Sequence, residues 1–185
     1  FHKTSNYNIQ LFLYKYRAFL SDHNITTEIV PTERAAIFRF TFPESKDSYV
    51  VIDAFDNGSY VKVIPAENKI IGYTTKNSGG VPANFKNYFT ITFDKPFTYS
   101  ATVSNGEIKV GQPDVKENHA GAIIGFATRK GEKVCARIAS SFISPEQAEQ
   151  NLKELGSMNL EELKLKGKER WNEVLGRIEV ESDNE

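Results

Sequence analysis

The three histidines are the first candidates for acid–base or metal chemistry, because imidazole titrates near neutral pH and often binds metals. His2, His23 and His119 are far apart and lie in polar, loop-like contexts. No H-E-x-x-H motif or paired histidine spacing is present, so a histidine-based metal site is not indicated. We expect surface histidines. A Ser/His/Asp triad is assembled in space and therefore stays open, although the sequence contains no G-x-S-x-G motif.

Carboxylates offer two further chemistries, calcium binding and glycoside hydrolysis. Residues 53–58 loosely resemble a calcium loop, but they lack its 1-3-5 ligand spacing and its closing glutamate. A hairpin turn with Asp53 at its shoulder explains the segment better. Glycoside hydrolysis needs two carboxylates about 5–10 Å apart in a cleft. Since the acidic residues lie mainly in turns and on predicted helix faces, we expect solvated charge and assign no catalytic or metal-binding residue.

Aromatic side chains are the candidates for sugar binding, because exposed rings stack on the apolar faces of pyranoses. Four tyrosines lie on or near predicted strands: Tyr60, Tyr73, Tyr88 and Tyr99. Tyrosine on a strand is more often a partly buried packing residue, and we favour that interpretation. Trp171 belongs to the apolar face of a predicted helix, so we interpret it as a docking anchor. No substrate-binding residue is assigned.

Composition limits the classes of protein to consider. The chain has 185 residues, enough for one domain with a small appendage, and a single cysteine, Cys135, which excludes an internal disulfide and a cysteine-based zinc cluster. The net charge of −1 argues against a nucleic-acid binder. No apolar run approaches the roughly 20 residues that a membrane span needs. Phenylalanine and tyrosine dominate the aromatic residues, which favours β-structure.

Alternating strand-like runs and turn residues fill positions 7–142 and predict about eleven strands in an antiparallel sandwich. Residues 36–42 alternate cleanly, with Phe38, Phe40 and Phe42 on one face. Residues 49–52 are apolar on both faces, which predicts a central strand. We expect hairpins at Asn57-Gly58, at Asn105-Gly106 and at 129–132. Residues 111–119 are polar and are expected to be irregular.

The hydrophobic period changes after residue 143 to one that predicts two helices. Ser144 is a candidate N-cap, with Pro145 at the first helical position, Gln147 completing a capping box, and Gly156 as the stop. Asn159 is expected to cap a second helix. Its apolar face comprises Leu160, Leu163, Trp171, Val174, Leu175 and Ile178. We therefore predict a β-sandwich domain at 1–143, a helical linker at 144–178 and an acidic tail at 179–185.

Short motifs follow one another in a fixed order along nearly the whole chain. T-E-I-V-P-T-E-R occupies 27–34, and R-F-T-F-P occupies 39–43. The later motifs are I-G-Y at 71–73, Y-F…F-D-K-P-F within 88–97, A-G-A at 120–122, S-F-I-S at 141–144, Q-A at 147–148, N-L at 151–152 and W-N…L…I-E-V within 171–180. The ordered series resembles family 92 of the glycoside hydrolases, which are bacterial exo-acting α-mannosidases.

The resemblance implies a fold that is mainly β, an antiparallel sandwich of the supersandwich kind followed by two linker helices. It also implies that the chain is part of a larger enzyme. The catalytic acid, the base and a calcium ion would lie in a helical-barrel domain of the same polypeptide, so no catalytic or metal residue is carried onto this chain. A Gly- and His-rich opening segment of the family is absent. At Gly80-Val81 the family often has Gly-Trp, so a contact made by that tryptophan would be altered.

The leading hypothesis is that the chain is the non-catalytic sandwich of an exo-α-mannosidase that removes terminal α-mannose from glycans by an inverting, calcium-dependent reaction. Its implied location is periplasmic, cell-surface or secreted in a bacterium. One alternative is a stand-alone carbohydrate-binding or adhesion sandwich, which predicts sugar binding at an aromatic patch without a partner. Another is a purely structural sandwich, which predicts a large apolar patch near the two helices.

Overall fold

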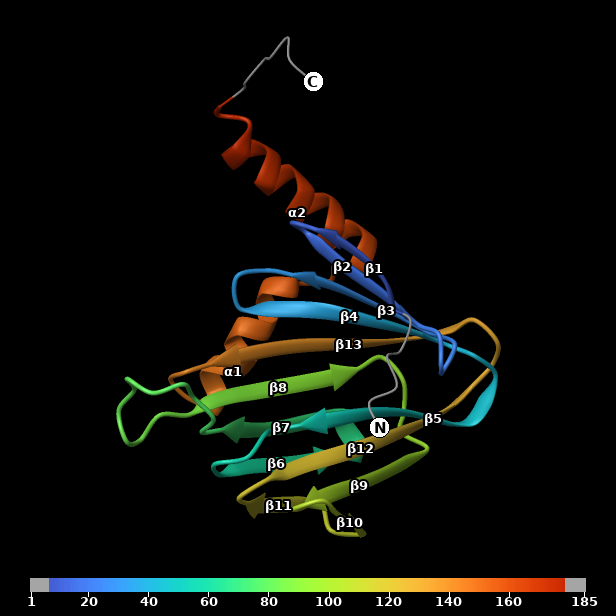
Figure 1. The fold of residues 1–185 in the computed structure, drawn as a ribbon, viewed down its shortest axis with the longest axis vertical. Coiled ribbons are helices and arrows are strands. Elements are labelled where there is room, and N and C mark those ends of the chain that lie inside the picture. The colour runs from blue at the N-terminus through green and yellow to red at the C-terminus, as the bar shows by residue number, and fades with distance from the viewer. Residues whose placement is uncertain (1–6, 179–185) are drawn as a thin grey trace.

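Thirteen strands in two antiparallel sheets form the protein, in a computed structural model that describes residues 7–178. The larger sheet has nine strands, in the spatial order β1 (Tyr7–Phe12), β2 (Lys15–Leu20), β3 (Ile25–Pro31), β4 (Ala35–Phe42), β13 (Glu132–Ser141), β8 (Asn87–Phe93), β7 (Lys69–Thr74), β6 (Ser59–Ile64) and β11 (Asp114–Glu117). The smaller sheet has four, in the order β10 (Glu107–Val110), β9 (Tyr99–Ser104), β12 (Ala120–Thr128) and β5 (Ser45–Asp53). A short 3-10 helix, η1 (Pro65–Glu67), joins β6 to β7. The predicted antiparallel sandwich is confirmed (Figure 1).

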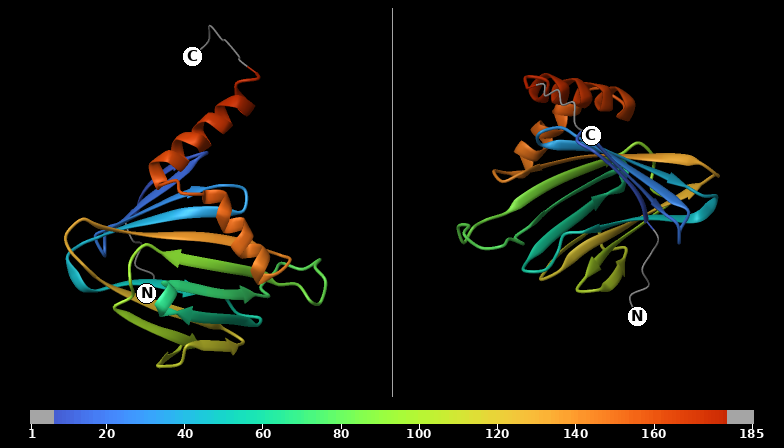
Figure 2. Two further views of the ribbon diagram at one scale, coloured as in Figure 1. Left: turned by 180° about the vertical axis from the view of Figure 1, so that it is seen from behind. Right: turned by 45° about the horizontal axis from the view of Figure 1, so that its top comes forward.

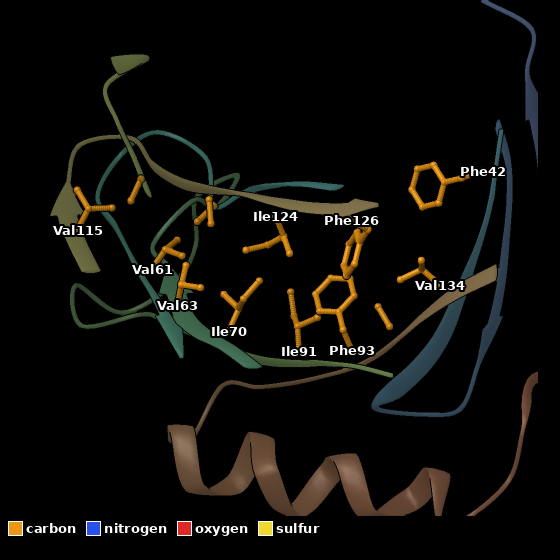
Figure 3. Packing of buried hydrophobic residues seen from close by; sticks show 14 residues of the cluster. Phe42, Val61, Val63, Ile70, Ile91, Phe93, Val115, Ile124, Phe126 and Val134 are labelled. Atoms are coloured by element: carbon orange, nitrogen blue, oxygen red, sulfur yellow. The ribbon is translucent and has the colours of Figure 1, made fainter. Parts of the chain in front are cut away.

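The main core lies between the two sheets. Ile124 and Phe126 on β12 face Ile70, Ile91 and Phe93 of the larger sheet, and all five side chains are buried (Figure 3). The rings of Phe93 and Phe126 are 5.4 Å apart between centroids. Burial of a large apolar side chain contributes about 1.5–3 kcal/mol to folding, so this layer holds the sheets together.

The predicted alternation in β4 is confirmed. Phe38, Phe40 and Phe42 face the core between the sheets, whereas Ile37 lies in a second buried cluster on the opposite face. Arg39 shares that opposite face, as the two-residue period of a strand requires. β4 therefore contributes to two separate hydrophobic clusters.

One of the three predicted hairpins is confirmed and two are wrong. Asn105 and Gly106 both have positive φ and join the paired strands β9 and β10. Asn57 and Gly58 also have positive φ, but β5 pairs with β12 while β6 pairs with β7. The turn at 129–132 likewise leads from β12 in one sheet to β13 in the other. These residues determine a local turn, whereas the strand that follows is free to join either sheet.

Two other strand predictions are corrected, and one strand had not been predicted. The run 49–52 belongs to β5, an edge strand of the smaller sheet rather than a central one, and Tyr49 and Val51 are exposed. The supposedly irregular segment 111–119 contains β11, which pairs with β6. Residues 15–20, which lack clean alternation, form β2 and pair with both β1 and β3. Cross-strand partners stabilise these segments despite their weak local patterns.

Two helices follow the strands and lie on the outer face of the nine-stranded sheet (Figure 2). α1 (Pro145–Leu152) continues into the 3-10 helix η2 (Lys153–Leu155), and α2 (Leu160–Leu175) follows. The Ser144 hydroxyl caps α1 as predicted, but the Gln147 side-chain amide donates to Asn151 rather than completing a capping box. Asn159 and Glu162 form a full capping box at α2. Gly156 ends η2 with a φ of 49°.

The helices enclose the second core cluster. It consists of Val30, Ala35, Ile37 and Ala139 from the sheet and Leu155, Leu160 and Leu163 from the helices. Within the described residues, no helix is long and apolar enough to cross a membrane. The predicted tail at 179–185 lies outside the described residues.

Candidate functional site

One end of the sandwich gathers most of the longer loops. Strand pairing places Ala35 opposite Ala139 and Tyr88 opposite Ser141, so the loop before β4 lies near the loop that leads into α1. Ser59 pairs with both Thr74 and Glu117, which adds the loops before β6, after β7 and after β11. We call this region the loop end: residues 32–34, 54–58, 75–86, 118–119 and 142–144. In Figure 1 the 75–86 loop projects from it at the left.

An open groove of about 500 Å³ lies at the loop end. Tyr73 of β7 contributes to its lining, together with polar and charged residues from the 54–58 and 75–86 loops and from the end of β11. The lining residues are Asn57, Gly58, Ser59, Tyr73, Thr75, Lys86, Lys116, Glu117 and Asn118. The groove is therefore a polar surface with one aromatic ring in it.

Three of the four candidate tyrosines meet beside this groove. Tyr60 and Tyr73 stack with centroids 5.8 Å apart, and Tyr73 meets Tyr88 edge-on at 5.9 Å. The Tyr60 hydroxyl donates a hydrogen bond to Asp114 at 3.3 Å. Burial raises the pKa of Tyr60, and the negative charge of Asp114 raises it further. Tyr99 is not part of the group, because it packs on Tyr49 across the smaller sheet. The alternating pattern of the sequence did not show that Tyr99 lies in the smaller sheet and the other three tyrosines in the larger one.

The tyrosine cluster is built as packing rather than as a free sugar platform. Lys86 places its Nζ over the Tyr73 ring, 4.3 Å from the centroid. A cation in that position occupies the ring face that a pyranose would need. All three rings are partly buried, as the packing interpretation predicted.

The turn at 53–58 is held by hydrogen bonds that occupy its carboxylates. Asp53 Oδ1 accepts from Phe55 N at 2.8 Å and contacts His119 Nε2 at 2.7 Å. Burial opposes ionisation of Asp53, but these two hydrogen bonds hold its pKa below the usual value. Asp56 pairs with Lys76 at 2.6 Å. These engaged carboxylates do not fit a calcium site, and no group of three or more candidate metal ligands exists within residues 7–178.

A catalytic triad does not follow from the Asp53–His119 contact. Ser59 lies in the same region, but its hydroxyl is buried, donates to Phe55 O and accepts from Ala120 N. Cys135 is half-buried, and burial raises the pKa of its thiol to about 11, which keeps it protonated and unreactive near neutral pH. His23 is exposed, as predicted, and His2 lies outside the described residues.

Phe55 is a notable residue that sequence reasoning missed. Its φ is +63°, a conformation that bulky residues rarely adopt, and 54% of its surface is exposed. Asp53 binds its backbone N–H and Ser59 binds its carbonyl oxygen, so hydrogen bonds on both sides maintain the strained backbone. An aspartate two residues before Phe55 was the available signal, because such residues favour local turns.

Further exposed apolar side chains lie at the loop end. The rings of Phe85 and Phe142 are 5.6 Å apart, yet Phe142 remains 69% exposed and its neighbour Ile143 is exposed as well. Val81 is also exposed on the 75–86 loop. The loop end therefore combines a polar groove with apolar side chains that this chain leaves uncovered.

Helix α2 is fixed to the sheet at its first turns by charged groups. Arg39 pairs with Glu28 at 2.6 Å and with Glu161 at 2.8 Å, and Lys15 also contacts Glu28. Hydrogen bonds from Lys164 and Arg39 lower the pKa of Glu161 to about 2. The later part of the helix has less support, since Trp171 is 40% exposed and Leu175 is exposed too. In Figure 2, α2 extends beyond the sheet.

Comparison with known proteins identifies the family. The model of the glycosyl hydrolase family 92 N-terminal domain matches residues 2–141. A search of curated proteins by sequence found no match. The solved structure of the family GH92 inverting mannosidase BT2199 from Bacteroides thetaiotaomicron VPI-5482 is 37% identical and superposes with a TM-score of 0.89, covering 94% of this chain and 24% of that one.

Two other solved structures extend the comparison. The family GH92 α-mannosidase BT3965 from Bacteroides thetaiotaomicron, in complex with mannoimidazole, is 28% identical, with a TM-score of 0.87, 97% of this chain covered and 25% of that one. A bacterial glucoamylase shares the fold alone, at 13% identity and a TM-score of 0.65, with 94% of this chain and 29% of that one covered. The chain thus spans about a quarter of the length of the mannosidases it matches. It belongs to glycosyl hydrolase family 92, as an example of the family's N-terminal domain.

Proposed function

We propose that the complete protein is an exo-acting α-mannosidase that hydrolyses terminal α-mannose from glycans by inversion, and that this chain is its non-catalytic sandwich. The observation that carries the proposal is the 37% identity to an inverting mannosidase over 94% of the chain. The family match over residues 2–141 supports it independently of that single relative.

The state of the carboxylates supports a non-catalytic role for the chain. An inverting glycosidase needs one carboxyl group as the acid and another as the base, about 6.5–9.5 Å apart across the sugar. At the loop end and next to it, Asp53 and Asp56 are held by His119 and Lys76, and Glu154 is held by Thr32 and Arg34. Their pKa values are all lowered, so none is suited to donate a proton at neutral pH.

The proposed role of the chain is to support the catalytic barrel domain. α1, η2 and α2 lead away from the sandwich, and Trp171, Val174 and Leu175 remain exposed near the end of α2. These side chains would pack on the barrel, while the exposed Phe55 and Phe142 would contact it from the loop end. The resemblance to the family implies that a calcium ion binds in the barrel, and the 53–58 turn, whose carboxylates are engaged by His119 and Lys76, is not proposed as a site for it. A periplasmic, cell-surface or secreted location is part of the same proposal.

The test compares the complete enzyme with residues 1–185 on α-linked mannobiose, following released mannose. We expect release by the complete enzyme, loss of that release after chelation of calcium, and no release by residues 1–185. Mannose release by residues 1–185 alone would overturn the non-catalytic role. Failure of the complete enzyme to cleave α-linked mannobiose of any linkage would overturn the proposed activity.

The stand-alone carbohydrate-binding alternative is less well supported, because Lys86 covers the Tyr73 ring. It predicts that titration of residues 1–185 with mannobiose changes tyrosine fluorescence. We expect no such change.

A further inference from the structure

Gly167 is an unexpected residue for the middle of a helix. α2 runs from Leu160 to Leu175, and an interior glycine destabilises a helix by about 1 kcal/mol relative to alanine. The φ of Gly167 is not positive, so the backbone conformation does not require glycine. The reason for a residue without a side chain therefore lies in what the helix contacts at this point.

The contact is with the turn that joins β1 to β2. Tyr14 lies in this turn, and a Cβ added at Gly167 would be 3.2 Å from the Cβ of Tyr14. Carbon atoms pack best about 3.5–4.0 Å apart, so even an alanine would push the two elements apart slightly. The backbone of α2 thus rests directly on the tip of the β1–β2 hairpin, which ends beside the helix in Figure 1.

Gly167 is the last point at which the sandwich supports α2. Leu160 and Leu163 are buried in the second core cluster, and Gly167 follows Leu163 by four residues, on the same face of the helix. Gly167 is partly buried, whereas every residue from 168 to 178 is exposed. Within residues 7–178, the Tyr14 contact is therefore the final support of the helix before it extends beyond the sheet (Figure 2).

Beyond this contact, the same face of α2 is apolar. Trp171 follows Gly167 by four residues, and Val174 and Leu175 follow one turn later. All three side chains are exposed. The direction in which α2 leaves the hairpin therefore decides where these apolar side chains are presented.

The tip of the hairpin is itself fixed to the sheet. The Tyr14 ring stacks on Phe12 with centroids 5.8 Å apart. Lys15, the next residue, pairs with Glu28 at 2.6 Å, and Glu28 also binds Arg39, which holds the first turn of α2. Because one charged network anchors both the hairpin and the start of the helix, the tip can serve as a fixed support.

We propose that Tyr14 and Gly167 are positioning residues, whose contact sets the direction in which α2 leaves the sandwich and thereby orients the catalytic domain against it. The helix amplifies any change at this point. Leu175 is three times as far from Leu163 as Gly167 is, so a shift of about 1 Å at Gly167 becomes about 3 Å at Leu175. The inference rests on the proposed function in one respect, namely that a catalytic domain follows α2.

An engineered disulfide tests the contact without relying on activity. Tyr14→Cys combined with Gly167→Cys, in the complete enzyme, places two Cβ atoms close to the separation of about 3.5–4.5 Å that a disulfide requires. We expect the bond to form on mild oxidation, as detected by mass spectrometry of the linked peptides. The matched control combines Tyr14→Cys with Glu169→Cys, because residue 169 points to the other side of the helix, and it should stay unlinked. Failure of the first pair to link, or equal linkage of both pairs, would overturn the contact.

The same disulfide distinguishes a fixed support from a moving one. We expect the oxidised enzyme to release mannose at the rate of the reduced enzyme, since the contact is maintained during turnover. Loss of mannose release on oxidation, recovered on reduction, would show that α2 has to leave the hairpin and would overturn the fixed support.

A crowding substitution with a rescue tests the positioning role. Gly167→Leu forces α2 away from Tyr14 and should lower kcat/KM for α-linked mannobiose by about tenfold, because small misplacements of a reacting site have large kinetic effects. Its melting temperature should stay close to that of Lys166→Leu, an exposed position on the same helix that should keep full activity. Adding Tyr14→Ala to Gly167→Leu makes room for the leucine and should restore most of kcat/KM.

Two results would refute the positioning role: equal kcat/KM for Gly167→Leu and Lys166→Leu, or no recovery when Tyr14→Ala is added. Absence of mannose release by the natural complete enzyme would instead overturn the proposed function, and the disulfide would still decide whether the contact exists.

Discussion

Arg39 and Glu161, which are 122 positions apart in the sequence, form an ion pair in which Arg39 Nη2 lies 2.8 Å from Glu161 Oε1. Arg39 is on the fourth strand and Glu161 is in the first turn of α2, so the pair joins the sandwich to the helix that leaves it. Glu28 accepts from the same guanidinium, which makes Arg39 the centre of a charged network. The network fixes where α2 starts, whereas Trp171, Val174 and Leu175 near the end of the helix remain exposed.

Replacing Glu161 tests how much this network contributes to stability. Glu161→Gln removes the charge that pairs with Arg39 and Lys164, and because Glu161 is half exposed we expect a loss of about 0.5–1 kcal/mol in the free energy of unfolding. Glu173→Gln is the matched control, since Glu173 pairs with Arg170 on the same helix and both side chains are exposed to solvent. Urea unfolding followed by circular dichroism measures both. Equal effects of the two substitutions would contradict the role of the Arg39 pair.

Acid should weaken the same contact. The folded-state pKa of Glu161 is about 2, below its ordinary value of 4.5, so the ionised carboxylate favours the folded state. This contribution is fully present above pH 4.5 and is lost as the pH falls toward 2. We expect the urea midpoint of the natural chain to drop through this range more steeply than that of Glu161→Gln. Parallel pH profiles would argue against the assignment. Glu28, whose pKa is also lowered, contributes to both profiles.

Gly72 should be nearly irreplaceable. It lies on β7 beneath the Phe89 ring, and an added Cβ would clash with the carbonyl oxygen of Tyr60 and lie 2.5 Å from Phe89 Cζ. We expect Gly72→Ala to cost about 3 kcal/mol of stability or to prevent folding, the upper range for overpacking. Gly79→Ala is the comparison, because Gly79 has a φ of +100° but no atom near the new Cβ. It should cost about 1–2 kcal/mol, the penalty for an L-residue in the left-handed region. Chemical denaturation of both variants decides whether contact or backbone strain matters more.

The strained backbone of Phe55 gives a prediction that links stability to activity. Phe55→Gly removes the penalty of a positive φ and should raise the free energy of unfolding by about 1 kcal/mol. If the exposed ring contacts the catalytic domain, as proposed, the same change should lower mannose release by the complete enzyme. Asn57→Gly is the control, because asparagine already tolerates its φ of +75°. If the Phe55→Gly enzyme keeps full activity, the loop end is not part of the proposed interface with the catalytic domain.

Much of the local structure was predictable from the sequence. The alternation of 36–42, the N-caps Ser144 and Asn159 and the positive φ at Asn105-Gly106 depend on near neighbours, and all are observed. The candidate site was less predictable. Tyr60, Tyr73 and Tyr88 meet while Tyr99 does not, because their strands belong to different sheets. Phe55 had no motif of its own, since its conformation depends on Asp53 and Ser59 acting together.

The sequence by itself determined the β-rich class, the change to helices after residue 143 and, through an ordered series of motifs, the family. Only the tertiary structure decided which sheet each strand joins. The turns at 57–58 and 129–132 connect different sheets, because local dihedral angles fix the bend but not the partner strand. For the same reason, the position of β5 at the edge of the smaller sheet became visible only when the strands were paired. Burial is a property of the assembled layers, and a strand pattern alone does not show which apolar face lacks a partner.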